Sequence, residues 1–301
     1  MKPKVALVLG SGGARGTAHI GVIRELVRQG YEISSISGTS MGALIGGVYA
    51  SGKIDEYESW MTSLSKRDVF NLVDFTLTKH GIIKADKVLN EIQSFISDRK
   101  IEDLPIKYSA IATDLKNKNE VVISEGSLFE AMRASISIPL VITPLQKNET
   151  LFVDGGVLNP IPVNRVARQK NDILLAVNVN SLISNNKLKK ENRDLEHFGI
   201  LNSNKLKRFQ KKLKRIVPEH KKENIGYFHL ISQTASLMLS QISKLTLEQN
   251  PPDILVEISR QSCGTFDFYR ASELIELGQE ATKESLENYS NSKSSSRKKQ
   301  Q

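Results

Sequence analysis

One serine of the chain stands in a setting that makes it a candidate nucleophile. Ser40 is the centre of residues 38–42, GTSMG, between a predicted short strand at 33–37 and a predicted helix at 41–50. A G-x-S-x-G turn from strand to helix holds its serine in a strained backbone conformation and lifts the hydroxyl clear of the sheet. The helix N-terminus also favours developing negative charge. We therefore predict a nucleophile here, although such letters alone also occur in tightly packed turns.

A glycine-rich loop at residues 10–16, GSGGARG, lies between an apolar run at 5–9 and a helical pattern that ends at Gly30. Backbone N–H groups of such a loop can converge on one oxygen anion. Ester hydrolysis needs such donors, and one of them is worth about 2.7–4 kcal/mol of barrier. The dinucleotide fingerprint G-x-G-x-x-G is not matched, because Arg15 occupies its third glycine position and no acidic residue ends the second strand.

Asp154 follows a predicted strand at 151–153 and is itself followed by Gly155 and Gly156. A carboxylate at the end of a buried strand, next to an open backbone, suits a general base beside a cleft. The same letters also form ordinary turns. The interpretation of Asp154 as a base therefore depends on the other two motifs.

Together and in this order, the three motifs resemble those of the patatin-like phospholipases, and in particular the compact bacterial members of that family. The family pattern is a glycine-rich loop ending in Arg/Lys-Gly, then G-x-S-x-G, then Asp-Gly-Gly or Asp-Gly-Ala. Supporting resemblance runs through residues 18–22, 134–139 and 159–162, so that it covers about residues 4–180. The combination is far more specific than any single motif.

The resemblance implies a catalytic dyad, with Ser40 as nucleophile and Asp154 as base. It places the oxyanion hole at Gly12, Gly13, Ala14 and Arg15, where the three small residues would donate N–H groups and the arginine would help to order the loop. The chain departs from the family at Ser11, where many members have a first glycine. The resemblance also implies an α/β fold with three layers, α/β/α, and a central mainly parallel sheet.

A catalytic triad is the alternative to this dyad, because histidines follow Asp154 in the chain. We expect none of the five histidines to be catalytic, since each lies in a charged stretch, in an apolar helical pattern or beside a structural turn; they are His19, His80, His197, His220 and His229. Asp154 would then accept the serine proton directly. A free aspartate is a weak base, with a pKa near ~3.9. Geometry, dehydration and the oxyanion loop would have to compensate.

The net charge of +9 is concentrated in residues 187–222, where thirteen Lys and Arg face four acidic residues and leave 29 of each sign elsewhere. Within 205–217 an apolar stripe at helical spacing is surrounded by cations, which suits an anionic membrane surface. A helix with a solvated charged face fits equally well. Nucleic acid is an unlikely partner, because the segment has few aromatic residues for stacking.

The rest of the composition is that of an ordinary globular protein. One cysteine, Cys263, excludes an internal disulfide and favours a reducing compartment, and no apolar stretch approaches the ~18 residues of a membrane span. We expect a cytoplasmic protein, peripheral on the inner face of the membrane if the basic segment docks there. Neither a cofactor nor a metal is predicted, because no ligand spacing is present.

We predict one domain at residues 1–289, with a basic insert at about 182–225, and a disordered tail at 290–301. Residues 55–105 are predicted to be largely helical, and a closing helix to run from Ala271 to about Leu286. The predicted activity is hydrolysis of fatty acyl esters of phospholipids or lysophospholipids through an acyl-serine intermediate. The alternatives are a general carboxylesterase for small esters and a lipid-sensing or partner-binding protein with low turnover.

Overall fold

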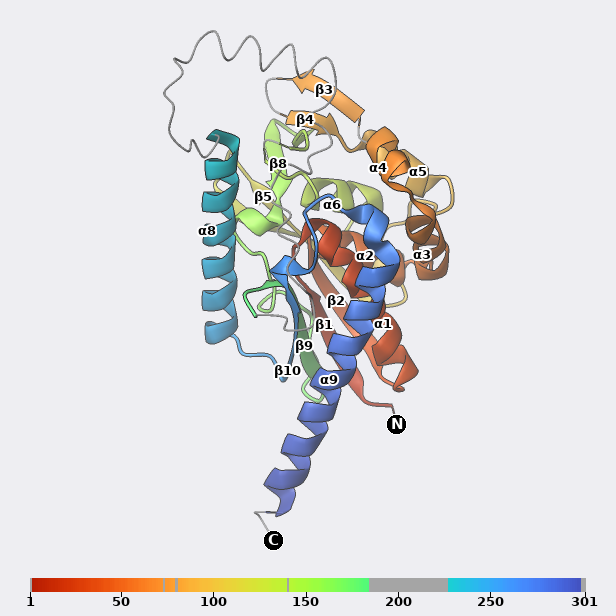
Figure 1. Ribbon diagram of the computed structural model, residues 1–301, viewed down its shortest axis with the longest axis vertical. Helices are drawn as coiled ribbons and strands as arrows, with labels where there is room; N and C mark the ends of the chain where they lie inside the picture. Colours follow the sequence, from red (N-terminus) through yellow and green to blue (C-terminus); the bar gives the residue numbers. More distant parts are fainter. Residues whose placement is uncertain (1, 73, 79–80, 140, 184–226, 299–301) are drawn as a thin grey trace.

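The central sheet of the protein has the strand order β10-β9-β1-β2-β5-β8-β7, with β6 paired to β5 outside this path (Figure 1). The computed structural model describes residues 2–72, 74–78, 81–139, 141–183 and 227–298. The strands of this sheet are β1 Lys4–Leu9, β2 Glu32–Thr39, β5 Lys107–Asp114, β6 Asn119–Ile123, β7 Leu145–Lys147, β8 Thr150–Asp154, β9 Ile173–Ser181 and β10 Ile254–Ser259.

The strands β10, β9, β1, β2 and β5 are parallel, and the antiparallel β6, β7 and β8 extend the sheet at one end. Leu9 at the end of β1 stands opposite Gly38 of β2 and Val177 of β9. The loops that follow these parallel strands therefore leave from one edge, where ligands of open α/β sheets bind. A mainly parallel sheet with flanking helices confirms the predicted fold class.

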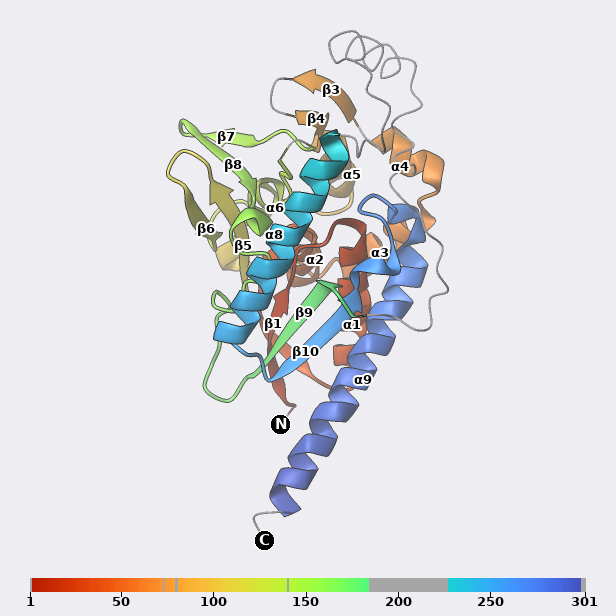
Figure 2. The same ribbon diagram turned by 60° about the vertical axis from the view of Figure 1, so that its left-hand side comes forward.

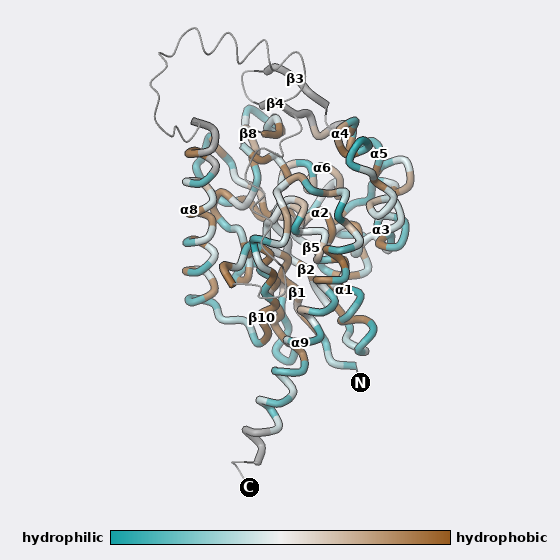
Figure 3. The backbone as a smooth tube through the Cα atoms, viewed as in Figure 1, coloured by the Kyte–Doolittle hydropathy of each residue, from teal (hydrophilic) through white to brown (hydrophobic). Residues whose placement is uncertain are grey.

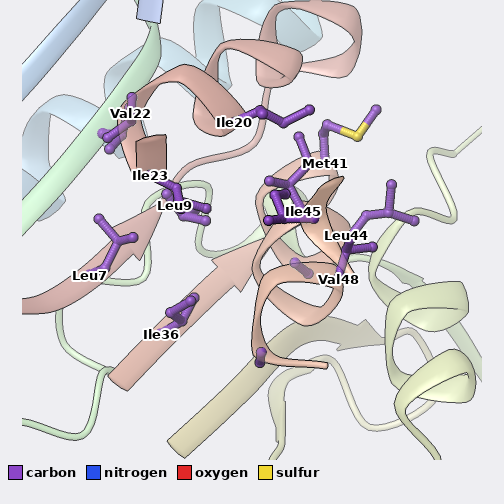
Figure 4. Packing of buried hydrophobic residues seen from close by; sticks show 14 of the residues in the cluster. Leu7, Leu9, Ile20, Val22, Ile23, Ile36, Met41, Leu44, Ile45 and Val48 are labelled. Carbon is purple, nitrogen blue, oxygen red and sulfur yellow. The ribbon is translucent and has the colours of Figure 1, made fainter. Parts of the chain in front are cut away.

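Strand β1 is buried on both faces. Leu7 and Leu9 belong to the large core cluster, whereas Ala6 and Val8 belong to a second cluster on the opposite side. This alternation is the period of two of a strand, and burial of both faces explains the uninterrupted apolar run of residues 5–9. Figure 4 shows Leu7 and Leu9 among side chains of the neighbouring helices, such as Ile23.

Helices α1, α2 and α9 supply the large cluster on one face of the sheet. The helices are α1 Ala18–Arg28, α2 Met41–Ala50, α3 Ile54–Ser63, α4 Lys66–Leu72, α5 Asp86–Gln93, α6 Leu128–Ser135, α8 Tyr227–Gln249 and α9 Ala271–Lys298. Helices α1 and α9 touch through glycines, because a Cβ on Gly21 would lie 1.9 Å from the Ile275 carbonyl oxygen and one on Gly278 would lie 2.1 Å from that of Ala18. These close contacts pack α9 against α1.

Helix α8 lies along the other face of the sheet (Figure 2). Its residue Leu247 packs against the cluster that contains Ala6 and Val8. Apolar residues are also spread along the rest of this helix (Figure 3). The exposed ones are Leu230, Leu237, Met238 and Leu245.

The region 55–105 is less helical than predicted. Besides α3, α4 and α5 it contains the antiparallel hairpin of β3 Asp74–Thr78 and β4 Gly81–Lys84, and the short 3₁₀ helix Ile101–Asp103. The hairpin sequences DFTLT and GIIK carry threonines, an aromatic residue and paired isoleucines, which favour strands. Runs this short leave strand and helix periodicities indistinguishable, which is why the prediction was wrong here.

The closing helix is longer than predicted, because α9 continues to Lys298 and so includes most of the tail predicted to be disordered. No glycine or proline interrupts residues 279–298. Serine hydroxyls instead bond to carbonyls one turn earlier, Ser290 to Leu286 at 2.9 Å and Ser294 to Ser290 at 3.0 Å. Polar composition alone was therefore a poor guide to this end of the chain.

The basic segment 187–222, with the helix predicted at 205–217, lies outside the described residues. The domain of residues 1–289 with a basic insert accordingly stays a prediction. Within the part of the chain that the structure describes, no helix is long and apolar enough to cross a membrane.

Candidate active site

The three motifs found in the sequence converge at one edge of the sheet. The glycine-rich loop follows β1 and the serine turn follows β2, its parallel neighbour. On the far side of β2, strand β5 pairs its Ile111 with Thr39 and its Ala112 with Asp154 of β8. Strand β5 thus sets the register that brings the residue after Thr39 beside the Asp154 carboxyl.

Ser40 forms a strained elbow between β2 and α2. Its backbone has φ 57° and ψ −125°, a left-handed φ that is uncommon for a residue with a side chain. The turn leaves no room for Cβ atoms on either side: one on Gly38 would lie 2.5 Å from the backbone of α2, and one on Gly42 would lie 2.1 Å from the Leu9 carbonyl oxygen. The two glycines of the pentapeptide are therefore steric requirements.

The elbow is held by a second serine, from α6. The Ser40 N–H donates to Ser135 Oγ at 2.8 Å, and this hydroxyl donates to the Ile111 carbonyl at 2.6 Å. Both bonds are buried, which makes them stronger constraints than exposed ones. Ser135 was included in the sequence resemblance, but no motif assigned it a role.

Hydrogen bonds to successive backbone groups fix the start of the glycine-rich loop. The Gly10 N–H donates to Val177 at 3.1 Å, and the Ser11 N–H donates to Pro160 at 2.8 Å. The carbonyl of Gly10 accepts a 2.8 Å bond from His19 Nε2. Strand β9, the segment after Asp154 and helix α1 thus all anchor this loop.

Further along the loop, two backbone amides have no hydrogen-bond partner among the described residues, whereas a third has one. The Ala14 N–H donates to the Thr265 carbonyl at 2.8 Å, so this residue leaves the predicted set of oxyanion donors. Gly12 and Gly13 donate no hydrogen bond to any described residue. Gly13 has φ +55°, and a Cβ there would lie 2.7 Å from the Thr265 oxygen, which explains the glycine. Two adjacent unpaired amides are what an oxyanion hole requires.

Arg15 lies under the loop and is 8% exposed. Its Nη1 donates to the Cys263 carbonyl at 2.9 Å, and its Nε donates to Asn180 Oδ1 at 3.1 Å. Burial lowers its pKa from the usual value of a guanidinium. These contacts suit a residue that orders the loop, and they direct its guanidinium to the backbone and to Asn180.

Asp154 is 5% exposed and stands at the end of β8. Its Oδ1 accepts a 2.7 Å bond from the Gly156 N–H, while Oδ2 has no hydrogen bond of ordinary geometry to a described residue. Burial raises its pKa to about 6, although interactions with the Ser40 hydroxyl and the Gly156 N–H act in the opposite direction. The carboxyl is therefore a stronger base than a free aspartate and is mostly ionised at neutral pH.

Of the five histidines, only His19 has a described side chain. It is fully buried, bonds to Gly10 through Nε2, and leaves Nδ1 without a partner in the described structure. Burial lowers its pKa to about 4, so the ring is neutral. His19 therefore supports the loop from α1, as a structural residue would.

A cavity of about 140 Å³ opens beside Ser40 and Gly13. Its wall is almost wholly apolar and comes from α2, α3, α4, α5, the segment after α6 and the segment 265–268. Wall residues include Leu44, Trp60, Met61, Val88, Ile142 and Phe268. No sequence motif pointed to these residues, because they come from distant segments and each one looks like ordinary core.

The site has the parts of an acyl-transfer centre: an elbow serine, an adjacent carboxylate with a raised pKa, two unpaired amides and an apolar cavity. In the described part of the chain, no group of three His, Cys, Asp or Glu residues could hold a metal ion. The chemistry available to the described groups is nucleophilic attack with proton transfer.

Comparison with known proteins agrees with this chemistry. The family model described as "Patatin-like phospholipase" matches residues 7–167. An uncharacterized NTE family protein of Mycobacterium bovis is 33% identical over 330 residues, covering 95% of this chain and 92% of that protein. Mouse patatin-like phospholipase domain-containing protein 7 is 31% identical over 205 residues, covering 65% of this chain and 14% of that protein.

Among solved structures, VipD from Legionella pneumophila matches with a TM-score of 0.46 and 13% identity, covering 96% of this chain and 67% of that one. A match at this level adds nothing to the sequence relationships.

Proposed function

The chain belongs to the patatin-like phospholipase family, a family of lipid acyl hydrolases, and on that premise we propose that it hydrolyses fatty acyl esters of phospholipids or lysophospholipids through a Ser40–Asp154 dyad. The observation that carries the proposal is the apolar cavity beside the elbow serine, since Ser40 and Gly13 both line it. A fatty acyl chain in this cavity would place its ester carbonyl beside the Ser40 hydroxyl and the free amides.

In the acylation step, Asp154 Oδ2 takes the proton of the Ser40 hydroxyl while Oγ forms a bond to the ester carbonyl carbon. The carbonyl oxygen becomes an oxyanion, and the N–H groups of Gly12 and Gly13 stabilise it. The tetrahedral intermediate collapses, the ester C–O bond breaks, and the leaving alcohol takes the proton from Asp154. Water then repeats the sequence on the acyl-Ser40 ester, which releases the fatty acid and restores the serine.

The raised pKa of Asp154 supports its role as base. General bases work best when their pKa lies near the operating pH, and burial moves this carboxyl from 3.8 to about 6. Oδ2, which has no hydrogen-bond partner among the described residues, would accept the serine proton without losing an existing hydrogen bond. Burial thus provides the basicity that a free aspartate lacks.

Two other functions compete with this one. A carboxylesterase for small soluble esters would use the same residues, but an apolar cavity lined from α2 to the 265–268 segment favours a substrate with an alkyl chain. A lipid-sensing protein with low turnover would keep the cavity and not need the dyad. The free Oδ2 and the strained elbow favour turnover, since strain of this kind concentrates at functional sites.

The test is hydrolysis of long-chain lysophospholipid by the wild-type protein and by Ser40→Ala. We expect turnover to fall by several orders of magnitude in the variant, because the covalent step is lost. Ser124→Ala, an exposed serine just after β6, is the matched control and should keep full activity. Wild-type turnover in Ser40→Ala would refute the proposal, and hydrolysis only of acetyl esters by the wild type would favour the carboxylesterase.

For residues 187–222 we propose contact with an anionic lipid surface, because they carry the whole net charge of the chain. Cations near such a surface contribute about 1 kcal/mol each. Co-sedimentation with anionic vesicles should weaken as salt rises, and should be mostly lost when Lys207, Arg208, Lys211, Lys212, Lys214 and Arg215 are replaced by Gln. Salt-independent sedimentation would contradict this contact.

A further inference from the structure

Asn180, near the end of β9, connects the oxyanion loop to the sheet and belongs to none of the three motifs. Its Nδ2 donates to the Ser11 carbonyl at 2.5 Å, and its Oδ1 accepts from Arg15 Nε at 3.1 Å. Its own backbone N–H donates to Asn178 Oδ1 at 3.0 Å. One side chain thus contacts two residues of the loop, on either side of the free amides.

The bond to Ser11 has a consequence for the next amide. A trans peptide unit is planar, so its C=O and its N–H point in opposite directions. The carbonyl of Ser11 and the N–H of Gly12 belong to the same peptide unit. By holding that carbonyl, Asn180 fixes the direction of the Gly12 N–H, which donates to no described residue.

The position of this peptide is fixed by the same strand. A Cβ on Gly12 would lie 2.2 Å from Val179 Cγ2, so the loop rests directly on the residue before Asn180. Arg15 determines which way the Asn180 amide faces. Its Nε can only donate and therefore takes Oδ1, which leaves Nδ2 for the Ser11 carbonyl.

We propose that Asn180 is a positioning residue that aims the Gly12 N–H at the oxyanion formed on the substrate. The inference rests on the proposed function, since it assigns a supporting residue to that reaction. The described hydrogen bonds of the Asn180 side chain go to Ser11 and Arg15 and not to Ser40, so that it would act through the peptide unit of Ser11. The stabilisation at stake is that of one oxyanion donor, whose loss lowers kcat by about 10²–10³-fold.

The test is Asn180→Asp in the chain of 301 residues. An aspartate keeps the size of the side chain and the acceptor for Arg15, but it has no N–H for the Ser11 carbonyl and repels that oxygen. Asn90→Asp, at an exposed position of α5, is the matched control, because it adds the same charge away from the loop and from Asn180. For Asn180→Asp we expect kcat on lysophospholipid to fall by about 100-fold with little change in KM, whereas the control stays close to wild type.

A second readout separates positioning from a general loss of structure. A fluorophosphonate places its phosphoryl oxygen where the oxyanion forms, so its rate of reaction with Ser40 should fall in parallel with kcat. Circular dichroism and thermal unfolding verify the fold of each variant. If Asn180→Asp does not fold, Asn180→Ala removes the bond to Ser11, and with it the acceptor for Arg15, without adding charge, and it should show a fall at least as large.

A folded Asn180→Asp or Asn180→Ala with wild-type kcat and labelling rate would overturn the inference, and so would an equal fall in Asn90→Asp. Ser40→Ala, measured alongside, separates this failure from that of the proposed function. An inactive Ser40→Ala beside a fully active Asn180 variant overturns the role of Asn180 alone. Turnover in Ser40→Ala overturns the proposed function itself.

Discussion

The edge of the sheet that carries Ser40 and Asp154 meets the wall of the cavity at Ser40, but the two regions are built differently. At the edge, glycines let backbone touch backbone, as where Gly42 meets Leu9 and Gly155 meets the Ile111 carbonyl. In the wall, side chains from helices pack loosely enough to leave a cavity of about 140 Å³. Backbone contacts fix atoms within a narrow range, whereas a wall of side chains can be reshaped by substitution. The two regions should therefore respond differently to mutation.

The largest effect is expected at the edge, for Asp154→Asn. The amide keeps the shape and the acceptor for Gly156, but it cannot take the serine proton. Turnover should fall by about 10²–10⁴-fold in steady-state assays, as loss of a general base does. In the wild type, kcat/KM should rise with pH to a plateau with an apparent pKa of about 6, the value that burial gives Asp154. A variant with near-wild-type turnover would exclude Asp154 as the base.

A smaller and selective effect is expected in the wall, for Val88→Phe. The larger side chain would occupy space that the acyl chain needs, so kcat/KM for a long-chain ester should fall about tenfold more than for an acetyl ester, in line with the discrimination available to apolar pockets. Val27→Phe, an exposed position on α1, is the matched control. Equal losses for both esters would show that the cavity does not hold the acyl chain.

The smallest expected effect is a gain in stability, whereas the two preceding predictions are losses of activity. The folded pKa of Asp154 exceeds its unfolded value of 3.8, so the folded state binds the proton more tightly and loses stability as pH rises from about 4 through 6. At pH 8 the buried charge costs up to about 3 kcal/mol. Asp154→Asn should therefore unfold at a higher temperature than wild type at pH 8, with a gap that closes toward pH 4. A variant less stable at pH 8 than wild type would contradict the raised pKa.

A site residue could be predicted from the sequence where its geometry depends on neighbouring residues in the chain, and not where it depends on distant ones. Ser40 and Asp154 stand in turns whose glycines mark close backbone contacts. The short sequence motifs around them are therefore enough to predict the geometry of these turns. Ala14 was misjudged because its N–H is taken by Thr265, which lies far away in the chain. Asn180 could not be predicted for the same reason. Its side chain contacts residues about 170 positions earlier in the chain, and no local sequence pattern indicates such contacts.

The helices and strands that could be predicted are those with long, clear sequence patterns. The alternation of β1, α1, β2 and α2 was predicted because long apolar patterns and glycine stops agree there. The β3–β4 hairpin was missed because each strand is short, and the end of α9 because serine-rich sequence was equated with disorder.

In the proposed reaction, Ser40 attacks the ester and carries the acyl group. The most direct test of this step is mass spectrometry of the wild-type protein after reaction with a fluorophosphonate bearing an alkyl chain, followed by peptide mapping. We expect a single adduct on Ser40, formed much more slowly in Asp154→Asn and absent in Ser40→Ala. An adduct on another residue, or no adduct in a wild-type protein that hydrolyses lysophospholipid, would contradict it.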